Sequence, residues 1–226
     1  MDNQKIIWAS VGVLAVLIIA GGAWWMSRGE VPTRNLGTLT EPVTATDWRK
    51  GGAEAVVEIV EYSDFECPAC AAYYPILNQL VVEYPEEVAL IYRYFPLPQH
   101  ASAELTAAFA EAAGRQGKFW EMHNIMFDNQ SAWTISSAAD NEALFKTYAG
   151  QIGLNLAQLE ADLADPTILA HIRAEYQSGV ASGVDSTPSF FINGERIINP
   201  RRYEDFVALI EGQLSPVSGA TSTNEL

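Results

Sequence analysis

Apolar residues along the chain follow a strand-like pattern, then a helix-like one, then a second strand-like one. Val56–Tyr62 is a short apolar run that predicts a strand. Cys70–Tyr84 is typical of a helix, and Pro85 ends it. Val88–Phe95 predicts a second strand. The order of these elements indicates an α/β fold.

A long helical stretch separates these strands from two shorter ones. Residues 101–178 are rich in Ala, Glu and Leu, and Gly and Pro break them into about four or five helices. Ser189–Ile192 and Glu195–Ile198 then flank Asn193-Gly194, a turn typical of a β-hairpin. Tyr203–Gln213 predicts an amphipathic helix that closes the fold.

Composition divides the chain into a leader, a linker, a folded part and a tail. We expect residues 1–28 to form a membrane anchor or a signal peptide. Residues 29–47 are rich in Thr, Pro and Gly and predict a flexible tether. Residues 48–214 have the length of one domain, and residues 215–226 are typical of a disordered tail.

Ile6–Met26 is an uncharged and mostly apolar run. At ~1.5 Å per residue, a helix of this length crosses the ~30 Å hydrocarbon core of a bilayer. Trp8 at one end and Trp24-Trp25 at the other suit the two interfaces. The alternative is a cleaved signal peptide, with Gly21-Gly22-Ala23 near the cut. We favour the anchor, because the run is long for a signal peptide and the Trp pair follows the small residues.

The N-terminal run predicts where the domain is located, and the net charge argues against one class of partner. Either interpretation of residues 6–26 exports the rest of the chain, to the periplasm or the cell surface, provided that the N-terminus stays inside. Cleavage would release the domain as a secreted protein. The net charge of −15 argues against nucleic acid as a partner, because like charges repel.

Cys67-Pro68-Ala69-Cys70 holds the only cysteines of the chain, between the first predicted strand and its helix. Cys67 lies at or just before the first helical turn, where free N–H groups and the helix dipole stabilise a thiolate. Pro68 suits the first helical position, where no N–H is needed. Cys70 lies one turn further and is turned partly inward. We therefore expect Cys67 to bind the substrate sulfur and Cys70 to resolve the mixed disulfide.

Two other roles for the cysteine pair have less support. A zinc or iron–sulfur site needs more ligands, and His100, His123 and His171 show no paired ligand spacing. A purely structural disulfide would close so short a loop that it would stabilise the fold little. We therefore expect redox chemistry that needs no metal and no organic cofactor.

Segments along the domain share a pattern with one known family. They are Glu61–Cys70 (EYSDFECPAC), Arg93–Leu97 (RYFPL), Gly117–His123 (GKFWEMH) and Gly183–Gly194 (GVDSTPSFFING). Together and in this order, they resemble the DsbA-like branch of the thioredoxin superfamily, over about residues 40–213. The resemblance implies a thioredoxin fold with a helical insertion, at about residues 101–178, before a strand led by a cis-proline.

The resemblance also implies roles for residues around the cysteines. Pro188 corresponds to the cis-proline that faces the pair, and the backbone of Thr187 would pair with an extended substrate. Pro68 and Ala69 would contact the same substrate. Glu61 corresponds to a buried acid that relays a proton to or from Cys70. The alternative for Glu61 is an outward-facing strand residue, and that for Pro188 is an ordinary turn proline.

The direction of electron flow is less well defined by the sequence. The strongest oxidants of the family carry His where this chain has Ala69, and Thr187 is a residue type seen in isomerase-like relatives. Asp64 and Glu66, if exposed near Cys67, would oppose its thiolate and weaken the oxidant. The alternatives are an isomerase or a reductase of the same fold, or a tethered peptide-binding or chaperone module without catalysis.

The favoured interpretation is an extracytoplasmic thiol–disulfide oxidoreductase that donates the Cys67–Cys70 disulfide. Its expected substrates are exported polypeptides with free thiols. A quinone-linked membrane protein or another thiol reoxidase would restore the disulfide. Of the remaining residues, we expect His123 at the surface or in a satisfied polar contact and His100 near the active-site face. Four aromatic residues are expected in the core of the insertion: Phe119, Trp120, Phe127 and Trp133.

Overall fold

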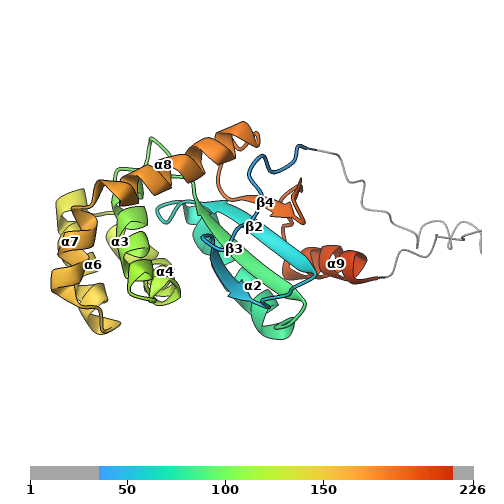
Figure 1. The fold of residues 1–226 in the computed structure, drawn as a ribbon, viewed down its shortest axis with the longest axis horizontal. Coiled ribbons are helices and arrows are strands. Elements are labelled where there is room, and N and C mark those ends of the chain that lie inside the picture. Colours follow the sequence, from blue (N-terminus) through green and yellow to red (C-terminus); the bar gives the residue numbers. More distant parts are fainter. Residues whose placement is uncertain (1–35, 216–226) are drawn as a thin grey trace, which may run out of the picture. The chain divides into compact units, whose positions relative to one another are not determined.

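A five-stranded sheet forms the centre of the structure, a computed structural model that describes residues 36–215 (Figure 1). The strands are β1 (Trp48–Gly51), β2 (Val57–Ser63), β3 (Val88–Tyr94), β4 (Ser189–Ile192) and β5 (Glu195–Arg196). Their order is β1-β3-β2-β4-β5. β2 and β3 are parallel, and the other neighbouring strands are antiparallel. The predicted α/β class is confirmed.

Helices flank this sheet on both faces and extend beyond its edge (Figure 1). Those of the described region are α2 (Pro68–Glu83), α3 (Ala103–Arg115), α4 (Phe119–Asp128), α5 (Gln130–Trp133), α6 (Ala138–Gln151), α7 (Leu156–Leu163), α8 (Pro166–Ala181) and α9 (Tyr203–Leu214). The span predicted at residues 6–26 and the tail from residue 216 on lie outside the described residues. Within residues 36–215, no helix is long and apolar enough to cross a bilayer.

α2 and α9 cover one face of the sheet. Leu77 and Leu80 of α2 and Phe206 of α9 pack with Ile59 of β2 in one buried apolar cluster. Successive strand residues point to opposite faces, so Glu61 lies on the same face as Ile59. The fold therefore places this carboxyl beneath the helix that carries the cysteines.

The insertion between β3 and β4 contains α3 to α8, six helices where about four or five were expected. The short helix α5 accounts for the difference, because one turn leaves little periodic signal in the sequence. Phe109, Trp133 and Phe145 are fully buried at the centre of the insertion. α8 leads from the insertion back over the sheet (Figure 1), where Tyr176 stacks on Phe95 at 4.5 Å between ring centroids.

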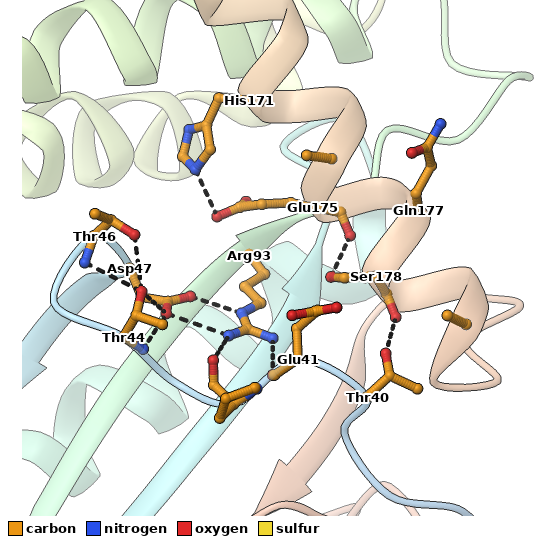
Figure 2. Close-up of a pocket in the computed structure, with 13 residues that line it drawn as sticks. Thr40, Glu41, Thr44, Thr46, Asp47, Arg93, His171, Glu175, Gln177 and Ser178 are labelled. Carbon is orange, nitrogen blue, oxygen red and sulfur yellow. Dashed lines mark hydrogen bonds and ion pairs between the residues drawn. The ribbon is translucent and has the colours of Figure 1, made fainter.

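Residues 36–47, here called the strap, are hydrogen-bonded to the domain. This differs from the flexible tether that the sequence predicted for residues 29–47. The backbone N–H of Leu39 donates to the carbonyl of Gly194 at 2.8 Å, so the strap extends the edge of the sheet. Arg93 donates to both carboxylate oxygens of Asp47, at 2.7 and 3.2 Å, and to the backbone carbonyls of Glu41 and Pro42 (Figure 2). Burial of this ion pair holds the strap on the domain, a contact that Thr- and Pro-rich composition does not reveal.

Candidate active site

The cysteine pair lies where β2 passes into α2. Cys67 is the N-cap of α2, Pro68 follows at the first helical positions, and Cys70 lies in the first turn. Both thiols are free, and both side chains are buried, with Cys70 fully covered and Cys67 at 6% exposure. The N-cap position predicted for Cys67 exposes its sulfur to the unpaired N–H groups of the first turn.

The two thiols differ sharply in acidity. A hydrogen bond from the Cys70 thiol lowers the pKa of Cys67 to about 5, with further help from Thr187 and from the N–H groups of Cys70 and Ala69. Burial, by contrast, raises the pKa of Cys70 well above its ordinary value. The first thiol is therefore ionised near neutral pH and the second holds its proton, which is the asymmetry that disulfide exchange requires.

The loop before β4 faces Cys67. The Thr187–Pro188 peptide bond is cis. The Cys67 thiol donates to the backbone carbonyl of Thr187 at 3.4 Å, and Asn199 donates to the carbonyl of Pro188 at 2.6 Å. The Thr187 hydroxyl is buried and has no hydrogen-bond partner in this arrangement. It lies close enough to Cys67 to donate to its thiolate.

Glu61 is buried in the middle of the sheet at 2% exposure, so it is not an outward-facing strand residue. Burial raises the pKa of its carboxyl to about 8, although a hydrogen bond from Ser63 opposes the rise. The Ser63 hydroxyl donates to Oε1 of Glu61 at 2.8 Å. The electrostatic influence of Glu61 reaches both cysteines. A carboxyl with this pKa can give up or accept a proton near neutral pH.

Asp64 and Glu66 do not face Cys67 as exposed charges. Asp64 is buried and accepts from the Leu97 N–H at 2.8 Å and from the His100 ring at 2.7 Å. Glu66 accepts from the Ser102 N–H at 2.6 Å. Both carboxylates instead hold the segment that leads from β3 into the insertion. His100 lies beside this cluster, three residues from the start of α3.

Two polar side chains of the insertion contact the site region, and the sequence identified neither contact. Gln130 of α5 is buried, and its amide donates to the carbonyls of Phe65 at 2.7 Å and Cys67 at 2.9 Å. His123 was expected at the surface or in a polar contact; it is buried, and burial lowers its pKa to about 3. Its ring nitrogen bonds the Asn124 side chain at 3.0 Å. The Gln130 contacts join residues more than 60 positions apart, and the His123 ring meets the Phe65 ring edge-on, so neither contact leaves a local pattern in the sequence.

A polar pocket of about 540 Å³ lies away from the cysteines, between the strap and α8 (Figure 2). Its lining includes Asp47, Arg93, His171 and Glu175. Arg93 pairs with Asp47, and His171 contacts Glu175 at 3.3 Å, so each of these charged side chains has a partner within the pocket lining. Among the described residues, no group of three or more His, Cys, Asp or Glu side chains is placed to hold a metal ion.

The sheet order, the insertion and the cysteine pair opposite a cis-proline define a protein of the thioredoxin fold. A family model described as Thioredoxin matches residues 44–212. The chain belongs to this family.

Solved structures share this architecture. Oxidised BdbD from Bacillus subtilis matches with a TM-score of 0.68 at 19% identity, over 79% of this chain and 98% of that chain. The α-DsbA1 of Wolbachia pipientis matches with a TM-score of 0.68 at 18% identity, over 77% and 94% of the two chains. A thioredoxin-like oxidoreductase from Silicibacter pomeroyi matches with a TM-score of 0.62 at 25% identity, over 76% and 95%. The first two identities are so low that they show the fold alone.

Curated relatives are much longer proteins. The chain is 35% identical over 165 residues to "Na(+)/H(+) antiporter NhaA 3" of Salinispora tropica, which is 73% of this chain and 24% of that protein. It is 31% identical over 197 residues to "Na(+)/H(+) antiporter NhaA" of Herminiimonas arsenicoxydans, or 84% and 30%. The chain thus spans less than a third of the length of these relatives, and their name describes those whole proteins.

Proposed function

We propose that the protein is a thiol–disulfide oxidoreductase that donates the Cys67–Cys70 disulfide to exported polypeptides with free thiols. The observation that carries the proposal is the acidity difference within one helical turn. Cys67 has a pKa lowered to about 5, whereas burial raises that of Cys70. Placement of Cys67 against the carbonyl of Thr187 adds support, because an extended substrate could pair with this backbone.

The reaction proceeds by two thiol–disulfide exchanges. A substrate thiolate attacks Sγ of Cys67, the Cys67–Cys70 bond breaks, and the electron pair of that bond leaves on Cys70. Glu61, with a pKa of about 8, supplies the proton that neutralises this sulfur. A second substrate thiolate then attacks the substrate sulfur of the mixed disulfide and releases Cys67 as a thiolate. The substrate loses two electrons and gains a disulfide, while both cysteines end reduced.

Substrate contacts in this scheme come from residues around Cys67. The backbone of Thr187 would pair with an extended substrate, and Pro188, which lacks an N–H, leaves the sulfur accessible there. Pro68 and Ala69 would form the opposite side of the contact. The Ala69 side chain has no donor to offer to the Cys67 thiolate, so we expect a weaker oxidant than relatives that carry His at this position.

The proposal also implies a location outside the cytoplasm and a partner that reoxidises the cysteine pair. Disulfides persist outside the cytoplasm, and the predicted anchor at residues 6–26 would place the domain there, in the periplasm or at the cell surface. A membrane thiol reoxidase, quinone-linked or other, would then accept the two electrons and restore the disulfide. Fractionation and protease accessibility of the full chain would test this location.

The experiment that tests the exchange is trapping with Cys70→Ala. Without the resolving thiol, Cys67 should accumulate mixed disulfides with exported proteins, visible as adducts that a reductant releases. The double variant Cys67→Ala/Cys70→Ala is the matched control and should give none. If Cys70→Ala forms no adducts, or Cys67→Ala keeps full function in cells, the protein acts instead as a peptide-binding or chaperone module.

Reduction potential separates the oxidant from an isomerase or a reductase. Equilibration of the purified protein with glutathione gives the potential of the Cys67–Cys70 pair. We expect a value above thioredoxin's ~−270 mV and below the ~−120 mV of the strongest oxidants of this type. A potential close to that of thioredoxin would favour a reductase, because the pair would then give up electrons to most substrate disulfides.

A further inference from the structure

Two buried hydroxyl groups lie on the face of the sheet that carries Glu61. Ser63 lies two residues further along β2, on the same face, and is 1% exposed. Its hydroxyl donates to Oε1 of Glu61 at 2.8 Å. Tyr92 is the residue of β3 in register with Glu61, so its side chain leaves the sheet on the same face. The tyrosine is fully buried, and its hydroxyl makes no direct hydrogen bond in this structure, although it lies close enough to Ser63 and Glu61 for both groups to act on it.

A buried hydroxyl without a partner costs free energy, so its retention calls for a physical reason. A neutral carboxyl accepts few hydrogen bonds, whereas an ionised one offers about four acceptor sites. The Tyr92 hydroxyl therefore suits a state in which Glu61 is charged. Ser63 already occupies one oxygen of that carboxyl, which leaves the other for a second donor.

Other titratable groups face this cluster from each neighbouring element. Cys67 and Cys70 of α2 interact electrostatically with Glu61. Asp64, just past β2, interacts with the Tyr92 hydroxyl, and His123 of α4 contacts the Tyr92 ring at 5.2 Å between centroids. In the part of the chain that the structure describes, the Ser63 hydroxyl is the side-chain donor that lowers the Glu61 pKa. Hydroxyl donors are thus the groups on hand to stabilise the carboxylate.

We propose that Ser63 and Tyr92 are positioning residues that set the proton affinity of Glu61 and so the pH at which this acid can protonate Cys70. The inference rests on the proposed exchange reaction. When the Cys67–Cys70 bond breaks, the proton moves from the Glu61 carboxyl to Sγ of Cys70, and the negative charge moves to the carboxylate. The Ser63 hydroxyl then donates to this carboxylate, and the Tyr92 hydroxyl donates to the carboxylate or to the Ser63 oxygen that supports it, without either group losing its own proton.

The test is a titration of Glu61 in the reduced protein by ¹³C NMR of the labelled carboxyl. Ser63→Ala and Tyr92→Phe each remove one donor and should raise the proton affinity of Glu61 about tenfold. Tyr94→Phe is the matched control, because Tyr94 lies on the same strand and face but its hydroxyl donates to Glu111 at 3.0 Å. An unchanged Glu61 titration in Tyr92→Phe and Ser63→Ala overturns the proposal, as does an equal rise in all three variants.

A second measurement separates this inference from the exchange reaction. The rate at which the oxidised protein forms a mixed disulfide with a small thiol peptide is followed against pH. In Ser63→Ala and Tyr92→Phe the pH profile should move to higher pH by the change seen in the Glu61 titration. A profile that stays in place while the titration moves overturns the link to Cys70. A wild-type protein that exchanges no disulfide contradicts the proposed function, and the NMR titration still decides whether the hydroxyls stabilise Glu61.

Discussion

Cys67 and Cys70 occupy one helical turn, and their surroundings give them opposite tendencies to ionise. Cys67 stands at the N-cap, where backbone N–H groups and the Cys70 thiol stabilise its charge. Cys70 is turned toward the sheet, where burial and the nearby Glu61 oppose a second charge. The two cysteines, three residues apart, thus differ in acidity: Cys67 ionises near neutral pH and Cys70 holds its proton.

Thr187→Val tests the hydroxyl that faces the reactive sulfur. The variant keeps the shape of the side chain but removes a donor to the Cys67 thiolate, whose pKa is lowered to about 5. We expect the acid dissociation constant of Cys67 to become about tenfold smaller, read from thiolate absorbance against pH. Ser186→Ala is the control, because its hydroxyl donates to Asp185 at 3.1 Å. Identical titrations of the two variants would show that the Thr187 hydroxyl has no part in the acidity.

The sequence predicted where the two cysteines lie, at the start of a helix, because a strand, two cysteines and a helix follow one another directly. The burial of Glu61 and the cis bond before Pro188 were predicted only from the resemblance to a known family, because neither feature leaves a local pattern in the sequence. Gln130 was missed because it lies far along the chain from the carbonyls of Phe65 and Cys67 that it binds. Such contacts depend on tertiary packing, which composition and periodicity do not encode.

At the scale of elements, α3 and β1 approach so closely that only a glycine fits between them. A Cβ on Gly114 would overlap the Trp48 ring, which stacks on Phe119 at 4.6 Å and donates to Glu111 at 2.8 Å. Gly114→Ala should therefore destabilise the protein by about 1–3 kcal/mol in denaturant unfolding. Gly150→Ala, in α6 with open space around it, should be neutral or stabilise by up to about 1 kcal/mol. Equal effects at both positions would contradict the close approach.

α5 connects the insertion to the active-site turn through one side chain. Gln130→Ala would leave the carbonyls of Phe65 and Cys67 without their amide donor, at a cost of about 1–3 kcal/mol. Gln130→Glu should cost more, because a carboxylate would face two carbonyl oxygens. Gln177→Ala, at an exposed position of α8, is the control and should be nearly neutral. Unfolding midpoints in denaturant give the ranking, and a Glu variant as stable as wild type would exclude this role.

Elements with strong periodicity were predicted to within a few residues, and short polar ones were not. β1 was missed because Trp48, Arg49, Lys50 and Gly51 carry no apolar alternation; as an edge strand it pairs only with β3. Its polar side chains find partners on neighbouring segments, such as Glu58 for Arg49 at 2.6 Å and Asn78 for Lys50 at 2.7 Å. The sequence predicted a tether in place of the strap because the strap contacts residues far along the chain, such as Gly194 and Arg93.

At the scale of the whole molecule, a buried polar network joins the insertion to the sheet. His171 of α8 contacts Glu111 of α3 at 3.0 Å and Glu175 at 3.3 Å. Glu111 also accepts from Trp48 and Tyr94, and Glu175 accepts from the Tyr94 N–H at 2.7 Å. The two carboxylates raise the pKa of His171 to about 10, so the ring is a cation at neutral pH. Charge on one histidine therefore helps to hold α3, α8, β1 and β3 together.

His171→Gln tests this network through the pH dependence of stability. The folded-state pKa of His171 lies above its ordinary 6.5, so its contribution is fully present below about pH 6.5 and is lost as pH rises toward about 10. Wild type should lose unfolding free energy across this window, and His171→Gln should be less stable below it and show a flatter profile. Chemical denaturation across this range measures both. A His171→Gln profile parallel to that of wild type would contradict a charged histidine in the fold.

Glu61 makes the free energy of unfolding depend on pH over a second, lower range. Its pKa rises from about 4.5 to about 8 on folding, so the folded state holds the proton more tightly and stability falls as pH rises between these values. Cys67 acts oppositely, because its lowered pKa adds stability as pH rises, so the comparison belongs in a Cys67→Ser/Cys70→Ser background. There Glu61→Gln should remove the decline between about pH 4.5 and 8 and make the protein more stable than its parent at neutral pH. A gain in stability would mean that Glu61 destabilises the fold and that its role is to carry a proton. A loss of stability would make Glu61 a structural residue.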